Sequence, residues 1–188
     1  MRNFARMKEW RMPAEWEPQA FVQLTWPHAD TDWQPMLDEI TETYVQMADA
    51  ITARERLLIV HPHPETVKAI LAERLEKEQA ERITYFQCET NDTWARDHGF
   101  ISLVKRKEKR GEICLLDFCF NGWGEKFEAS LDNAINAKLF SMLDCYANTP
   151  AYENHLDFVL EGGSIEIIID CGASAPSSSA SCSSRRAC

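Results

Sequence analysis

Two short segments gather the residue types that bind a planar cation. Residues 91–99 read Asn-Asp-Thr-Trp-Ala-Arg-Asp-His-Gly, so acids, an arginine and an indole lie together between two apolar runs. Further along the chain, Glu161 stands before two glycines at the end of another apolar run. A guanidinium presents paired N–H donors in one plane, and carboxylates are its natural receptors. Asp97 and Glu161 are therefore candidate guanidinium-binding residues, and the face of Trp94 is a candidate cation–π surface.

Each of these residues also has a purely structural interpretation. Asp97 could pair with its neighbour Arg96, Glu161 could cap a turn, and Trp94 could pack in the core beside its loop. The glycines after Glu161 favour a close backbone approach or a positive φ. Both interpretations stay open on these residues alone.

Hydrophobic patterning predicts an α/β protein that would position these segments. Strands are expected near residues 20–26, 57–60, 83–88, 99–105, 112–120, 157–160 and 164–169. Helices are expected over residues 34–54, from Pro64 to about Leu75, and over residues 128–146, where Leu131, Ile135, Leu139 and Met142 recur at helical spacing. The charged residues 106–111 predict a hairpin turn between two of the strands. Residues 91–99 are expected to form a loop that follows a strand, where α/β folds present ligand-binding groups.

Composition bounds the partners of the protein. The chain has 188 residues, 45% of them hydrophobic, which is enough for one folded core. Its net charge of −10 disfavours binding to nucleic acid or to anionic membranes, and it suits small cations. No apolar run is long enough to span a bilayer, and the first eleven residues do not resemble a signal peptide. We therefore expect a cytoplasmic protein, whose homo-oligomeric state the sequence leaves open.

The cysteines do not form a recognisable metal or disulfide pattern. Seven cysteines occur, and no two of them stand in a Cys-x-x-Cys pair. Cys114 and Cys119 alternate with apolar residues, which predicts small buried side chains on a strand. The sequence also offers His61-x-His63, a weak metal signal, and we expect no metal site there.

Four motifs in register resemble the agmatine deiminase and bacterial (Porphyromonas-type) peptidylarginine deiminase family. They are Met-Pro-Ala-Glu-Trp-Glu-Pro (residues 12–18) leading to Thr-Trp-Pro (25–27), Asn-Asp-Thr-Trp-Ala-Arg-Asp (91–97), Phe-Asn-Gly-Trp-Gly (120–124) and Glu-Gly-Gly-Ser (161–164). The resemblance implies a pentein, which is a propeller-like fan of ββαβ-like modules around a substrate channel. It also implies that Asp97 and Glu161 are catalytic residues, of which Asp97 binds the guanidinium and Glu161 lines the same pocket. Trp94 is implied to pack against the substrate.

The reaction implied by the resemblance is hydrolysis of agmatine to N-carbamoylputrescine and ammonia, in putrescine biosynthesis. A cysteine thiolate attacks the guanidinium carbon, a histidine assists loss of ammonia, and water hydrolyses the covalent adduct. No cofactor is implied. In that family the catalytic His-x-Asp motif and the nucleophilic cysteine come from the second half of a longer chain, so we expect this chain to be truncated and inactive by itself. A peptidylarginine deiminase-type enzyme and a non-catalytic guanidinium-binding module are the alternatives.

The last part of the sequence departs from the rest. We expect residues 1–169 to form the N-terminal part of a pentein deiminase domain. Residues 170–188 are rich in Ser, Ala and Cys and contain no Leu, Ile, Val, Phe, Trp or Tyr. Such a composition predicts a disordered tail, and its abrupt start suggests an out-of-frame extension.

Overall fold

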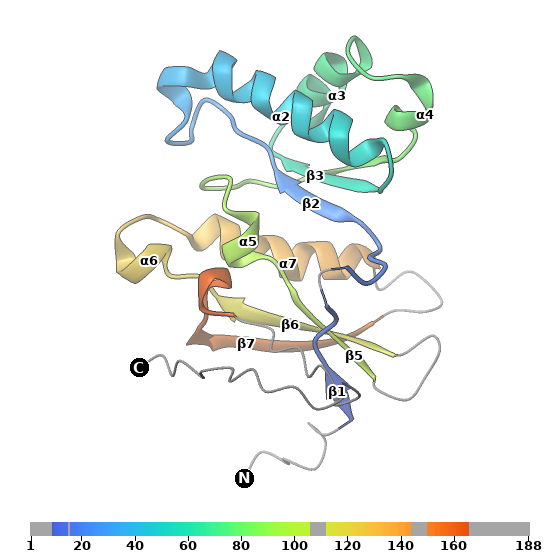
Figure 1. The fold of residues 1–188 in the computed structure, drawn as a ribbon. Coiled ribbons are helices and arrows are strands. Elements are labelled where there is room, and N and C mark those ends of the chain that lie inside the picture. The colour runs from blue at the N-terminus through green and yellow to red at the C-terminus, as the bar shows by residue number, and fades with distance from the viewer. Residues whose placement is uncertain (1–8, 15, 106–111, 144–149, 166–188) are drawn as a thin grey trace, which may run out of the picture.

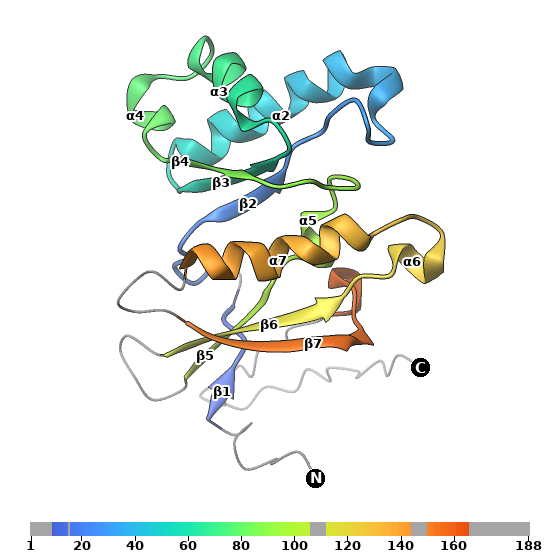
Figure 2. The same cartoon turned by 180° about the vertical axis from the view of Figure 1, so that it is seen from behind.

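A computed structural model of the protein describes residues 9–14, 16–105, 112–143 and 150–165. These residues form two sheets and the helices packed on them, stacked as alternating layers (Figures 1 and 2). The predicted mixed α/β class is confirmed, and no closed sheet forms within the described ranges. None of the helices in these ranges has the length and hydrophobicity needed to cross a membrane.

The first sheet contains three parallel strands in the order β2-β3-β4. Its central strand, β3 (Leu57–His61), is buried along its whole length, as its aliphatic run predicts. Leu57 and Ile59 belong to the core that includes helices α2 and α3, whereas Val60 packs with Ile135 in a second cluster. Alternate side chains of one strand therefore contact a different layer on each face. The other elements here are β2 (Val22–Thr25), η1 (Gln34–Met36), α2 (Leu37–Thr52), α3 (Pro64–Ala72), α4 (Lys77–Ala80) and β4 (Ile83–Gln87).

The second sheet has the strand order β1-β5-β6-β7. β1 (Trp10–Arg11) and β6 (Ile113–Cys119) both pair antiparallel with β5 (Ile101–Lys105). β7 (Ala151–Val159) pairs parallel with β6, and helix α7 (Ser130–Leu143) connects the two strands. Figures 1 and 2 show α7 between the two sheets, and its Ile135 contacts the Val60 cluster. The hairpin turn predicted at residues 106–111 lies outside the described residues.

Three predicted elements differ from the structure. β7 begins at Ala151 and not at residue 157, since its polar first half gives no apolar signal and its pairing with β6 makes it a strand. Ser164 ends the 3₁₀ helix η2 (Gly162–Ser164) and does not begin a strand. The expected loop at residues 91–99 contains one helical turn, α5 (Ala95–His98). The rest of the strand predicted at 164–169 and the tail predicted at 170–188 lie outside the described residues.

Candidate functional site

Three connections meet at one edge of the second sheet. β6 and β7 run parallel and β5 runs antiparallel to them, so the ends of β6 and β7 lie beside the start of β5. Helix α5 directly precedes β5, α6 (Gly122–Glu125) follows β6, and η2 follows β7. Figure 1 shows these three turns together at this edge. The motifs around residues 97, 123 and 161 are therefore brought together by strand order.

Asp97 lies in α5 with its carboxyl group partly buried. Burial raises the pKa of Asp97, and the negative charge of Glu161 raises it further. The backbone amide of Gly162 and the Arg96 guanidinium favour the ionised form and oppose this rise. Asp97 and Glu161 are thus close enough to repel each other, an arrangement that a shared cation would stabilise.

Glu161 is held by a strained turn. The amide nitrogen of Trp123 donates to Oε1 of Glu161 at 3.0 Å. Residues 122–125 all have positive φ, with values of 61, 55, 83 and 63°, which is rare for a residue as bulky as Trp123. A Cβ on Gly122 would stand 2.1 Å from the carbonyl oxygen of Phe127, so this turn requires glycine there. Such strained backbone clusters at ligand-binding and active sites.

Two indoles lie beside the carboxylates. The ring centroids of Trp94 and Trp123 are 4.8 Å apart and the rings meet edge to face. Trp94 is 37% exposed and Trp123 is 38% exposed, although Phe120 and Phe127 also contact Trp123. A large aromatic side chain that keeps a third of its surface in water is available to a ligand. A hollow of about 450 Å³ beside α6 includes Asn121 and Phe127 in its lining and includes neither carboxylate.

A close backbone approach fixes Asp97 relative to Glu161. A Cβ added to Gly162 would lie 2.3 Å from the carbonyl oxygen of Arg96 and 2.8 Å from its Cγ. The same construction at Gly163 meets no atom within 4 Å. Glycine at position 162 therefore permits η2 to rest directly on α5, which places the residue before it beside Asp97.

The structure brings together all three residues that the sequence proposed. Asp97 and Glu161 interact through their charges, and Trp94 is linked to Glu161 through Trp123. The structure adds Trp123, a residue of the Phe-Asn-Gly-Trp-Gly motif to which residue type alone assigned no role. Its signal was the Gly-Trp-Gly run, in which flanking glycines permit the positive φ values that turn the indole towards Trp94.

The described cysteines are buried or partly buried. Cys88 and Cys114 are buried, and Cys119 is partly buried at the end of β6. Burial raises the pKa of the Cys88 thiol, which disfavours the reactive thiolate. Within the described ranges, no group of three or more His, Cys, Asp or Glu side chains is arranged to hold a metal ion. Cys171, Cys182 and Cys188 lie outside the described residues.

Comparison with known proteins decides the family. The family model for the Porphyromonas-type peptidyl-arginine deiminase matches residues 11–168. The chain belongs to this family. The agmatine deiminase of Pseudomonas syringae pv. tomato is 30% identical over 172 residues, which cover 86% of this chain and 42% of that protein.

Solved structures of this family have the same fold. One is a Porphyromonas gingivalis protein with the provisional name arginine deiminase, which is 43% identical in sequence. Its match has a TM-score of 0.71 and covers 85% of this chain and 44% of the Porphyromonas gingivalis chain. The C315S agmatine deiminase of C. jejuni, solved with substrate bound, is 33% identical, with a TM-score of 0.64, covering 84% of this chain and 43% of its own. The chain thus spans less than half the length of the relatives it matches.

Proposed function

We propose that this chain binds the guanidinium group of agmatine and serves the hydrolysis of agmatine to N-carbamoylputrescine and ammonia. The main support is that Asp97 and Glu161 lie close together, beside the partly exposed indoles of Trp94 and Trp123. The agmatine deiminase names of several relatives support the choice of agmatine.

The chemistry of the four side chains suits a planar cation. Asp97 and Glu161 offer carboxylate oxygens to the N–H donors of a guanidinium, which would offset the repulsion between the two acids. An indole face contributes about 0.5 to 2 kcal/mol to a bound cation, depending on desolvation. In this proposal Asp97 and Glu161 hold the charged group while Trp94 and Trp123 contact its face.

Two further inferences follow from the family. We infer that the two sheets are consecutive modules of a pentein, which is consistent with a helix layer packed on each sheet. We also infer that turnover needs a nucleophilic thiolate and a catalytic histidine from the second half of the longer family chain. Accordingly, we expect the 188-residue chain to bind agmatine without releasing ammonia.

Calorimetric titration of agmatine into the 188-residue protein tests the binding step. Asp97→Asn and Glu161→Gln should each weaken binding about 10- to 100-fold, since a hydrogen bond to a charged group is worth about 1.5 to 3 kcal/mol. Asp38→Asn, on the exposed start of α2, is the matched control and should leave the affinity unchanged. Putrescine, a diamine without a guanidinium, should bind more weakly than agmatine. Equal binding by the wild type and Asp97→Asn would reject this site.

A turnover assay on the same samples separates the alternatives. Ammonia and N-carbamoylputrescine are measured with agmatine, and ammonia alone with a peptide ending in arginine. Binding without product is the expected result, whereas release abolished by Asp97→Asn would show that the chain supplies a nucleophile. The family model is described as a peptidyl-arginine deiminase. Preferential turnover of the peptide would therefore indicate that peptidyl-arginine, and not agmatine, is the substrate.

A further inference from the structure

Helix α7 has two polar side chains on its buried face. Asp132 and Asn136 are both 0% exposed and lie four residues apart, hence on the same side of the helix. Leu131 and Met142, two of the apolar residues that recur at helical spacing, are 38% and 36% exposed. Buried polar groups destabilise a protein unless they are hydrogen-bonded, so the partners of these two residues indicate what they do.

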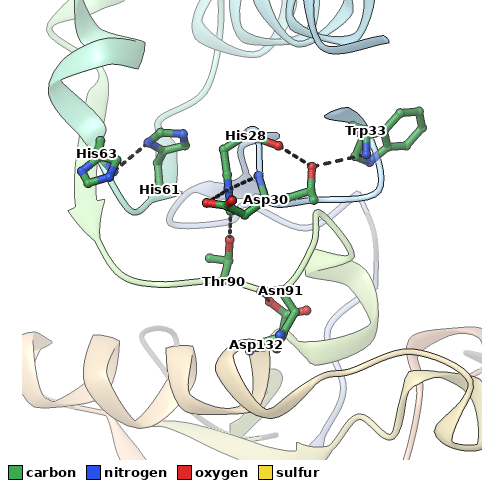
Figure 3. A network of polar contacts seen from close by, with 9 residues as sticks. His28, Asp30, Trp33, His61, His63, Thr90, Asn91 and Asp132 are labelled. Atoms are coloured by element: carbon green, nitrogen blue, oxygen red, sulfur yellow. Dashed lines mark hydrogen bonds and ion pairs between the residues drawn. The ribbon is translucent and has the colours of Figure 1, made fainter. Parts of the chain in front are cut away.

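Asp132 is joined to the start of the segment that carries Asp97. Its Oδ1 accepts hydrogen bonds from the amide nitrogens of Asn91 at 2.8 Å and Asp92 at 3.4 Å. In return, Oδ1 of Asn91 accepts from the amide nitrogens of Leu131 at 2.7 Å and Asp132 at 3.3 Å. Asn91 thereby satisfies free amides in the first turn of α7, and Figure 3 shows the pair where that helix begins.

Asn136 is joined to the end of the same segment. Its Nδ2 donates to the carbonyl oxygen of His98 at 2.7 Å and to Oδ1 of Asp117 at 2.8 Å. Both partners are acceptors, so the amide nitrogen must face them. Asp117 is itself fully buried on β6, and its Oδ2 accepts from the Tyr152 hydroxyl of β7 at 2.7 Å. Asn136 thus connects α5 to the two strands that end at the candidate site.

We propose that Asp132 and Asn136 are positioning residues, which hold residues 91–98 at both ends and so place Trp94 and Asp97 against Glu161. The role in binding rests on the proposed function, while the placement itself is a property of the fold. Neither side chain is expected to touch the ligand. The alternative is that both residues stabilise the protein without any specific effect on α5.

Leucine variants at the two positions separate these alternatives. Asn136→Leu and Asp132→Leu each remove the side-chain hydrogen bonds from that position of α7 to the segment. We expect each variant to raise the agmatine Kd about tenfold or more, as is typical when orienting residues are lost. Leu139→Ala, one turn further along the buried face, is the control for lost stability alone. It should lower Tm and leave the Kd within about twofold, because Leu139 is one of the apolar core side chains. Asp132→Asn keeps an acceptor oxygen and should retain near-wild-type affinity.

Amide hydrogen exchange measures the placement independently of agmatine. The amides of Asp97, His98 and Gly99 bond within α5, to carbonyl oxygens of Trp94 and Ala95. Their exchange should accelerate in Asn136→Leu and Asp132→Leu, relative to the rest of the protein, and should not do so in Leu139→Ala. If the wild type binds no agmatine, the proposed function fails while this comparison still decides the positioning role.

The proposal is overturned if Leu139→Ala matches the leucine variants in both Kd and local exchange at the same fraction folded. Asn91→Ala covers the case in which the leucine variants fail to fold. Asn91 is only partly buried, so the loss of its side chain removes one end of the connection at a typical cost for a helix cap. Unchanged affinity and unchanged exchange at Asp97 in Asn91→Ala would also reject the proposal.

Discussion

The charge of Glu161 affects the ionisation of Asp97 at the candidate site. Burial raises the pKa of Asp97 and the charge of Glu161 raises it further, so Glu161→Gln should move the pKa of Asp97 down. A carboxylate binds a guanidinium only when ionised, and agmatine affinity should therefore fall as pH is lowered through the pKa of Asp97. In Glu161→Gln this fall should occur at lower pH. Carboxyl NMR titration of Asp97 provides the measurement, and an unchanged midpoint would show that the two acids do not interact.

Asp132 should make the protein less stable as pH rises. Burial raises the pKa of this carboxyl group from 3.8 to about 6, despite the two amides that favour its ionised form. The folded state then binds a proton that the unfolded state has lost, so the contribution of Asp132 to stability is largest below pH 4 and declines as pH rises towards 6. The difference is worth roughly 3 kcal/mol at about 1.4 kcal/mol for each tenfold change in ionisation.

Asp132→Asn should remove this pH dependence. Compared with the wild type, the variant should gain stability at pH 7 and show little difference at pH 3.5, because Asp132 is mostly neutral there in both states. Urea unfolding at a series of pH values gives both free energies. A constant offset between the two proteins at every pH would contradict the raised pKa of Asp132.

At the scale of elements, apolar patterns in the sequence predicted the buried strands and helices, but not the features that depend on strand pairing or polar contacts. The aliphatic run at Leu57 and the helical spacing before Thr52 were sufficient to identify β3 and α2, because burial of apolar surface determines both. β7 was placed too late, since its first half is stabilised by pairing with β6. The burial of Asn136 on α7 was not foreseeable either, because its partners His98 and Asp117 are distant in sequence.

At the candidate site, too, some residues could be predicted from the sequence and one could not. Its carboxylates and Trp94 could be proposed from residue type and from the family motifs. Trp123 could not be assigned from residue type alone, because its role depends on four consecutive positive φ values and on an amide that reaches Glu161. Motifs in sequence therefore indicated the charged groups, while the three-dimensional turn identified the aromatic partner.

The contact between η2 and α5 predicts opposite outcomes for two neighbouring glycines. Gly162→Ala would place its Cβ against the Arg96 backbone and should cost about 1 to 3 kcal/mol, the usual range for overpacking. It should also displace Glu161 from Asp97 and weaken agmatine binding. Gly163→Ala meets open space and is the matched control. Thermal unfolding and calorimetric binding of both variants provide the comparison, and equal effects would show that the close approach does not matter.

At the scale of the whole molecule, residues 88–98 connect the two sheets. Nε2 of His28 hydrogen-bonds Oγ1 of Thr90 at 2.9 Å (Figure 3). The Trp33 indole donates to Oγ1 of Thr93 at 2.9 Å, and both His28 and Trp33 lie in the connection between β2 and α2. The opposite side of the same segment is held by α7. The candidate site therefore depends on both halves of the fold, although its carboxylates lie at the edge of only one sheet.

The hydrogen bond between Thr25 and His98 should couple the stability of the two sheets. Thr25 lies on β2 and is 0% exposed, and its Oγ1 stands 3.3 Å from Nε2 of the equally buried His98 ring. Thr25→Val keeps the shape and leaves this ring nitrogen without its partner, which should cost about 1 to 3 kcal/mol. Thr84→Val, at an exposed position of β4, is the matched control and should change stability little.

Amide hydrogen exchange, measured at one buried strand of each sheet, tests whether Thr25→Val destabilises both sheets. Amides of Ile59 in β3 and Leu115 in β6 should lose protection by the same free energy in Thr25→Val, because the segment between the sheets links them into one cooperative unit. Protection lost at Ile59 alone would mean that the sheets unfold independently. In that case the carboxylate edge would be stabilised by α7 and its own sheet, without help from the first three strands.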